Sequence, residues 1–245
     1  MQVQVTHETL YDYAPAVETA QHLAYLRPMH TPHQRLLSHS LEILPPPAQL
    51  RQTTDVFGNT RCFFSLQAPH AQLSVVATSV VETSAEAPPA SSITWEETRE
   101  RLRYRSDGRF DTATEFLFAS PFCPRDPAFG TYARPSFTPG ASVLAAALDL
   151  MRRIYNEFTY ESQSTEVNTP ALQALAQRKG VCQDFAHIMI ACLRAMEIPA
   201  RYVSGYLLTV APPGKVKLRG SDASHAWVAV YLPDLAPTLP PEDCW

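Results

Sequence analysis

The chain has 245 residues and a formal net charge of −4, with 45% apolar and 18% charged residues. This composition is ordinary for a globular protein, and the length is enough for one or two domains with a sizeable core. The small negative charge gives no electrostatic basis for binding nucleic acid or an anionic membrane, and no apolar run is long enough to span a bilayer. The first residues lack the basic and apolar segments of a secretory signal, so we expect a cytoplasmic protein with no nucleic-acid or membrane partner.

Residues 1–83 predict short strands separated by turns. Residues 2–6 alternate polar and apolar side chains, as a half-buried strand does. Further strand candidates are 23–28, 36–44, 61–66 and 73–82. Gly58–Asn59 predicts a turn between two of them, and Pro45–Pro47 interrupts the chain between others. We therefore expect an N-terminal antiparallel β-sandwich domain over residues 1–88.

Residues 89–245 predict a second, mixed domain that follows an Ala-, Pro- and Ser-rich linker at 84–92. Thr94 and Glu97 form a capping-box pattern that opens a short helix. Thr138–Pro139 predicts the start of a long helix. The apolar stripe of that helix is Val143, Ala147, Leu150, Ile154 and Phe158. Strand patterns follow at 198–208 and 226–232.

The segment Lys179–His187 carries the first candidate for chemistry. Gly180 is predicted to end a helix that Thr169 and Pro170 open, and a second apolar helical pattern begins almost at once. Cys182 then lies in the first turn of that second helix, where unpaired N–H groups and the helix dipole favour a thiolate. The alternative from position alone is a buried structural cysteine.

His225 is the second candidate. It precedes the strand pattern at 226–232, and the period of two places it on the same face as Trp227. A lone histidine there is more often structural. A cysteine at a helix start with a histidine at a strand start, however, is the layout of a thiolate–imidazolium pair. The imidazole would take the thiol proton, the thiolate would attack an acyl carbon, and the imidazolium would protonate the leaving amine.

The cysteines argue against a disulfide framework and against zinc. Their number is odd and no two form a C-x-x-C pair; they are Cys62, Cys123, Cys182, Cys192 and Cys244. Cys182 and His187 are close enough in a helix to share a metal, but no further ligand is near them in the sequence. Cys192 lies on the apolar stripe and is expected in the core. With no nucleotide loop, haem motif or acidic calcium loop, we expect neither a metal nor a cofactor.

Three motifs together resemble the bacterial transglutaminase-like family, part of the papain-like cysteine superfamily. They are Gly180-Val-Cys-Gln-Asp-Phe-Ala-His187, Ile198-Pro-Ala-Arg-Tyr-Val-Ser-Gly-Tyr206 and Asp222-Ala-Ser-His-Ala-Trp-Val228. The N-terminal region resembles the β-rich domain that precedes the core in these proteins, most closely at 55–59. The resemblance implies that residues 89–245 form a papain-like, transglutaminase-like α+β catalytic core, so that the whole chain is α+β. It also implies that Cys182 is the nucleophile and His225 the general base and acid, with the Cys182 N–H contributing to an oxyanion hole.

The third member of the family's triad is an aspartate in a Trp-x-x-x-Asp-Pro-Thr-like stretch. Trp245 resembles the beginning of that stretch, and neither Asp234 nor Asp243 matches the aspartate in register. We therefore expect the orienting aspartate to lie beyond Trp245. Without it, nothing would fix the tautomer of the imidazole.

Three functions remain open on sequence grounds. One is transglutaminase-like acyl transfer at an amide of a protein or peptide substrate, and the second is cysteine peptidase or amidase activity with water as the acceptor. The third is a non-catalytic peptide- or protein-binding scaffold. The acceptor and the oligomeric state are not readable from the sequence. Gly205 predicts a close backbone approach or a bulge, and Trp227 and Tyr206 are expected to pack in the core rather than line a groove.

Overall fold

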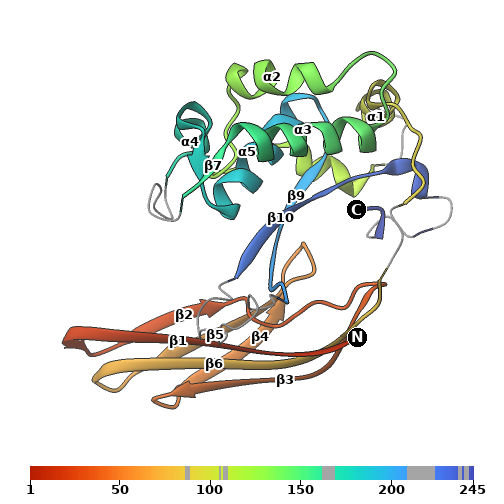
Figure 1. Cartoon of the computed structure of the whole chain (residues 1–245). Coiled ribbons are helices and arrows are strands. Elements are labelled where there is room, and N and C mark those ends of the chain that lie inside the picture. Colours follow the sequence, from red (N-terminus) through yellow and green to blue (C-terminus); the bar gives the residue numbers. More distant parts are fainter. Residues whose placement is uncertain are drawn as a thin grey trace, which may run out of the picture. The chain divides into compact units, whose positions relative to one another are not determined.

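The computed structural model describes residues 1–85, 89–104, 106, 110–161, 169–208, 224–236, 239 and 243–245. The chain divides into two compact units, Met1–Pro88 and Pro89–Trp245. The described residues of the first unit form strands and no helix, whereas the second unit mixes helices with strands (Figure 1). The predicted α+β class, with an antiparallel N-terminal region, is confirmed.

The first unit is built from two antiparallel sheets. Its strands are β1 (Gln2–Val17), β2 (Ala20–Ala24), β3 (Gln34–Leu44), β4 (Gln49–Thr54), β5 (Thr60–Leu66) and β6 (His70–Thr83). One sheet has the order β1-β6-β3 and the other β2-β5-β4, so the longest ladders join strands far apart in the sequence (Figure 1). Apolar residues of both sheets pack into one core: Ile43, Phe64, Leu66, Leu73 and Val75. The predicted sandwich is therefore confirmed, since two sheets bury their inner faces against each other.

The predicted turn at Gly58–Asn59 closes the β4–β5 hairpin. Asp55 accepts the N–H groups of Phe57 and Asn59 at 2.9 and 2.8 Å, and Gly58 has a φ of +83°. A positive φ is readily adopted by glycine because it has no Cβ. The prediction missed β4 itself, because its side chains are almost all exposed and leave no alternation to detect. The strand predicted at 23–28 is also misplaced, since β2 covers Ala20–Ala24.

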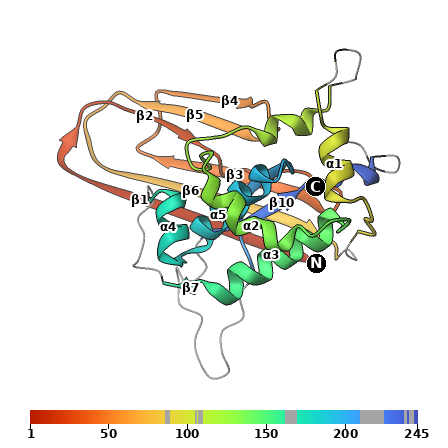
Figure 2. The ribbon, with the colours of Figure 1, turned by 90° about the horizontal axis from the view of Figure 1, so that it is seen from above.

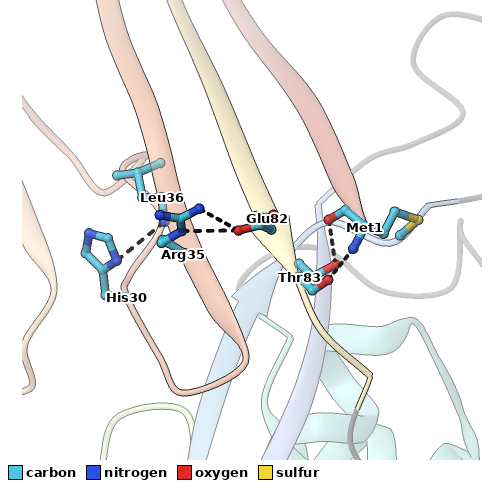
Figure 3. Close-up of polar contacts among 6 residues, drawn as sticks. All are labelled: Met1, His30, Arg35, Leu36, Glu82 and Thr83. Atoms are coloured by element: carbon cyan, nitrogen blue, oxygen red, sulfur yellow. Dashed lines mark hydrogen bonds and ion pairs between the residues drawn. The ribbon is translucent and has the colours of Figure 1, made fainter.

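Polar contacts across the first sheet are exposed and contribute little energy (Figure 3). Arg35 of β3 contacts the Glu82 carboxylate of β6 at 2.7 Å, with side chains 67% and 50% exposed. Such pairs are worth about 0–1 kcal/mol in water. The Met1 amino group donates to the Thr83 carbonyl, and His30 Nδ1 accepts the N–H of Leu36. Stability of this unit therefore comes mainly from the buried apolar core.

The second unit surrounds one central helix. Its elements are α1 (Trp95–Arg101), η1 (Thr112–Leu117), α2 (Pro127–Ala133), η2 (Arg134–Ser136), α3 (Val143–Glu157), β7 (Thr159–Tyr160), α4 (Ala171–Gln177), β8 (Lys179–Gly180), α5 (Cys182–Ala195), β9 (Ala200–Gly205), β10 (His225–Val230) and η3 (Pro233–Leu235). Helix α5 contacts α2, α3 and α4 as well as β9 and β10 (Figures 1 and 2). This position explains why α5 is apolar over most of its surface.

Two predicted helix starts need correction, and one is confirmed. Thr94 caps α1 with the predicted capping box, in which Glu97 bonds back to the Thr94 N–H at 2.9 Å. Helix α3 begins at Val143 with Ser142 as its N-cap, not at Thr138–Pro139, because the Ser142 hydroxyl accepts the N–H of Ala145. Helix α4 begins one residue later than predicted, with Pro170 as its N-cap. The predicted apolar stripe of α3 is buried as expected.

Asp234 ties the chain after β10 back to the start of the second unit. Its carboxylate accepts the hydroxyl of Ser91 at 2.9 Å and the N–H groups of Ser92 and Ile93 at 3.0 and 3.2 Å. Burial alone would raise the pKa of Asp234, but these hydrogen bonds stabilise the charged form and hold the pKa below its ordinary 3.8. The folded state therefore favours the ionised carboxylate.

We expect Asp234→Ala to lower the free energy of unfolding of the second unit by about 1–2 kcal/mol, because three donors lose their acceptor. The loss of unfolding free energy should have its full size above about pH 5. It should become smaller as the pH falls through the lowered pKa of Asp234, because folding favours only the ionised carboxylate. Tryptophan fluorescence in urea measures this, because Trp95, Trp227 and Trp245 all belong to the second unit. Asp149→Ala is the control, because this carboxylate has no hydrogen-bond or ion-pair partner among the described residues. An effect of Asp234→Ala that is independent of pH would contradict this account.

Candidate active site

Cys182 is the first residue of α5. The residue before it, Val181, is extended and acts as the N-cap, and its N–H donates to Asp184 Oδ2 at 2.8 Å. Asp184 is thereby fixed as a buried carboxylate in the first turn, with 4% of its surface exposed. The backbone N–H groups of this turn point out of the helix at the position of the thiol. A negative charge on sulfur is stabilised there by the helix dipole.

Cys182 differs from the other cysteines in its access to solvent. It is partly exposed, whereas Cys62, Cys123, Cys192 and Cys244 are buried. Burial raises the pKa of the Cys62 and Cys123 thiols, and that of Cys192 to about 12. The prediction that Cys192 is a core residue is confirmed by its 0% exposure. Of the five thiols, Cys182 is the one placed to react with a dissolved substrate.

Gly180 has a role that differs from the predicted one. The residue that ends α4 is Arg178, in the left-handed conformation with a φ of 55°, while Gly180 belongs to β8 and pairs with Tyr160 of β7. A Cβ on Gly180 would lie 2.7 Å from Asp184 Oδ2 and 2.8 Å from Asp184 Cβ. The glycine is therefore required by the close approach of Asp184, the residue that orders the turn at Cys182.

We expect Gly180→Ala to destabilise the second unit by about 2–3 kcal/mol, because an added methyl group cannot fit without displacing Asp184. Gly130→Ala in α2 is the matched control, since its new Cβ would meet Ala195 Cβ at an ordinary 3.7 Å. In a helix that change should be neutral or stabilising by up to about 1 kcal/mol. Urea unfolding, monitored by tryptophan fluorescence, gives the unfolding free energies of the two variants. Equal changes in both would show that the contact between residue 180 and Asp184 is unimportant.

His225 is the first residue of β10, where it pairs with Gly205 of β9. Val228 and Val230 on one face of β10 pack against the core around α5, and His225 lies on the alternate face with Trp227, as predicted. Nε2 of His225 is buried and has no hydrogen-bond partner among the described residues. A buried ring nitrogen without a partner is costly, so a hydrogen bond to this atom would stabilise the imidazole and fix its tautomer.

Both candidate residues belong to elements that meet, since α5 contacts β9 and β10. Within the described part of the chain, however, no hydrogen bond joins Cys182 to His225. The charge of Cys182 acts on Tyr202 of β9, whose pKa is raised by burial first and by Cys182 second. The Cys182–His225 pair therefore stays a prediction that rests on the motif and on the placement of both residues at element ends. Asp222 lies outside the described residues.

An aromatic stack that the sequence did not indicate covers the first turns of α5. The buried ring of His187 lies between the rings of Phe122 and Tyr202, with centroids 5.1 Å away on each side. Burial lowers the pKa of His187, and Asp184 only partly offsets this, so the ring is favoured in its neutral form. A tyrosine in a strand carries no pattern that marks it as functional, and this is why Tyr202 was missed.

Gly205 and Trp227 form a close contact of their own. A Cβ on Gly205 would lie 2.7 Å from the Trp227 ring, so the predicted close approach at this glycine is confirmed. Trp227 itself is 39% exposed, and the expectation that it packs in the core is wrong. The indole lies over the glycine because no side chain there displaces it.

Comparisons with known proteins place this site in a family. Residues 3–82 match the bacterial transglutaminase-like N-terminal region, and residues 131–238 match the transglutaminase-like superfamily. Rv2569c of Mycobacterium tuberculosis is 39% identical over 237 residues, covering 94% of this chain and 73% of that protein. ML0607 of Mycobacterium leprae is 34% identical over 232 residues, covering 94% and 79%. The chain belongs to the bacterial transglutaminase-like family.

The fold of this transglutaminase-like protein also occurs in a solved structure. A candidate cysteine protease from Cytophaga hutchinsonii superposes with a TM-score of 0.69 at 24% identity, covering 95% of this chain and 75% of that one. The predicted resemblance and fold are thus confirmed, and membership places the chain in a family of cysteine-dependent enzymes. The particular reaction is a separate question.

Two further observations bear on what the transglutaminase-like chain could bind. Among the described residues, no three His, Cys, Asp or Glu side chains gather as a metal site would require. In the same part of the chain, no helix has the length and apolar character needed to cross a membrane.

Proposed function

We propose that this protein forms a thioester on Cys182 by attacking an amide of a protein or peptide substrate, and then passes the acyl group to an amine or to water. The observation that carries the proposal is the placement of Cys182 at the first residue of α5, partly exposed, while the other cysteines are buried. Family membership supports a thiol enzyme, and the helix start supports a thiolate.

In the proposed mechanism, His225 takes the proton from the Cys182 thiol. The Cys182 sulfur then forms a bond to the amide carbon, and the electron pair of the carbonyl moves to its oxygen. Collapse of this intermediate breaks the carbon–nitrogen bond, and the imidazolium of His225 gives its proton to the departing nitrogen. An amine or water, deprotonated by the same imidazole, attacks the thioester and frees Cys182. The acceptor decides between transfer and hydrolysis.

The experiment that tests the proposal uses a glutamine-containing dipeptide with hydroxylamine as the acceptor. Ammonia release with formation of the hydroxamate indicates acyl transfer, and ammonia release alone indicates an amidase that uses water. Peptide mapping after a short reaction with p-nitrophenyl acetate should find the acetyl group on Cys182. A chain that releases no ammonia, gains no acetyl group and still binds peptides after Cys182→Ala would be a binding scaffold, and the proposal would be wrong.

We expect the substrate to be a protein or peptide that presents an amide. We expect the reaction to need no cofactor. A cytoplasmic location of the protein stays a prediction.

A further inference from the structure

Tyr202 is a partly exposed tyrosine whose ring packs on α5, the helix that begins at Cys182. It lies in the middle of β9, and 39% of its surface is exposed. Its hydroxyl has no hydrogen-bond partner among the residues that the structure describes, although many other polar side chains of this unit are bonded. A phenol that is available to donate, at the edge of a reaction centre, can bind a developing negative charge.

The ring of Tyr202 is held against the helix that carries Cys182. It stacks on His187 of α5 with centroids 5.1 Å apart, and His187 is held from the other side by Phe122 at the same distance. The carbonyl of His187 is contacted by the Cys123 thiol at 3.6 Å, which anchors the stack to the segment before α2. The phenol is therefore supported on a rigid strand and helix, as a preorganised donor must be.

The ladder turns Tyr202 toward α5. Tyr202 is paired directly with Val228, and paired residues of an antiparallel ladder point to the same face. Val228 packs against the core around α5, so Tyr202 lies on the face that meets the Cys182 helix.

The electrostatics keep the hydroxyl protonated. Burial raises the pKa of Tyr202, and the charge of Cys182 raises it further. The phenol therefore stays neutral over the range in which a thiol enzyme works, and it retains the proton that it would donate.

We propose that the Tyr202 hydroxyl donates a hydrogen bond to the oxyanion formed when Cys182 attacks a carbonyl carbon. In that step the sulfur–carbon bond forms and the carbonyl electron pair moves to oxygen, where the phenol O–H binds it. Collapse returns the pair and expels the leaving group, and the phenol proton stays on Tyr202 throughout. This inference rests on the proposed function, since it assigns a second donor to the same reaction.

Two reactions of the Cys182 thiol distinguish donation to the oxyanion from an effect of Tyr202 on the thiolate or on the fold. Acetylation of Cys182 by p-nitrophenyl acetate passes through a tetrahedral oxyanion, whereas alkylation by iodoacetamide displaces iodide and forms none. Tyr202→Phe removes only the hydroxyl and keeps the ring on His187. We expect the burst of p-nitrophenolate to slow by about 10- to 1000-fold, the range for losing one oxyanion donor, with alkylation within about twofold of wild type. Tyr155→Phe on α3, at a tyrosine 83% exposed, is the matched control and should change neither rate.

The outcomes are distinct. A Tyr202→Phe protein that is acetylated at the wild-type rate would overturn the inference and leave the proposed function intact. Equal losses in both reactions would also overturn it, because Tyr202 would then act on the thiolate or on the fold. A wild-type protein that is alkylated on Cys182 but gives no burst would overturn the proposed function and the inference together. Slower acetylation with unchanged alkylation is the supporting result.

Discussion

Cys182→Ala is expected to abolish formation of the acyl-enzyme and to lower turnover of amide substrates by on the order of 10⁴-fold or more. No other cysteine can replace the lost sulfur, because the remaining four are buried. The assays are the p-nitrophenolate burst, the peptide map of the acetylated protein and ammonia release from the glutamine dipeptide. Since Cys182 is partly exposed, its replacement should change the free energy of unfolding by less than about 1 kcal/mol.

Cys192→Ala is the matched control, because it removes a sulfur from the same helix at a residue with 0% exposure. Loss of a buried sulfur should cost about 1–2 kcal/mol of stability through the lost contacts and the small cavity. Activity per folded molecule should remain at the wild-type level. Turnover that survives Cys182→Ala, or that disappears equally in both variants, would contradict the assignment of Cys182 as the nucleophile.

His225→Ala is expected to lower amide turnover by about 10²- to 10⁴-fold, the usual range for loss of a general base and acid. The rate of Cys182 alkylation by iodoacetamide should also change its dependence on pH. An imidazole that takes the thiol proton makes the sulfur more nucleophilic, so removing His225 should slow alkylation near neutral pH. Stopped reactions at several pH values, with intact-mass detection, measure these rates.

The control for His225→Ala is His39→Ala, at a histidine of β3 that bonds the Ser79 hydroxyl at 2.9 Å in the first unit. It should leave the alkylation profile unchanged. Partial recovery of His225→Ala activity by added imidazole would identify a missing base rather than a misfolded protein. An alkylation rate that is the same with and without His225 at every pH tested would show that this histidine does not pair with Cys182, and the mechanism proposed above would be wrong.

Periodicity was sufficient to predict most of this fold. The alternation in β1 and β6 and the helical stripes of α3 and α5 appear in the structure where the sequence placed them, because each element buries one face and exposes the other. The capping box at Thr94 was readable because it depends on residues three positions apart. Strand β4 was not readable, since its side chains are exposed and carry no pattern.

Part of the candidate site could also be predicted from the sequence, and part could not. Local signals identified Cys182, because a helix start depends on its immediate neighbours. They also identified His225, because it opens a strong strand. The reason for Gly180 was misassigned: the sequence suggested a helix end, whereas the structure shows a carboxylate 2.7 Å from the missing Cβ. Tyr202 was not identified at all, because its stack on His187 joins two elements whose contact no local pattern records.

The sequence by itself determined the two-part α+β organisation, the family and the identity of the candidate nucleophile and base, since these depend on periodicity, caps and motifs that are local in the chain. The tertiary structure alone decided which cysteine reaches solvent, why Gly180 must be a glycine, and which aromatic rings stack on His187 of the Cys182 helix. These features depend on distances between side chains brought together by packing. A neighbour in space that is distant in sequence leaves no periodic signal, and only the folded chain reveals it.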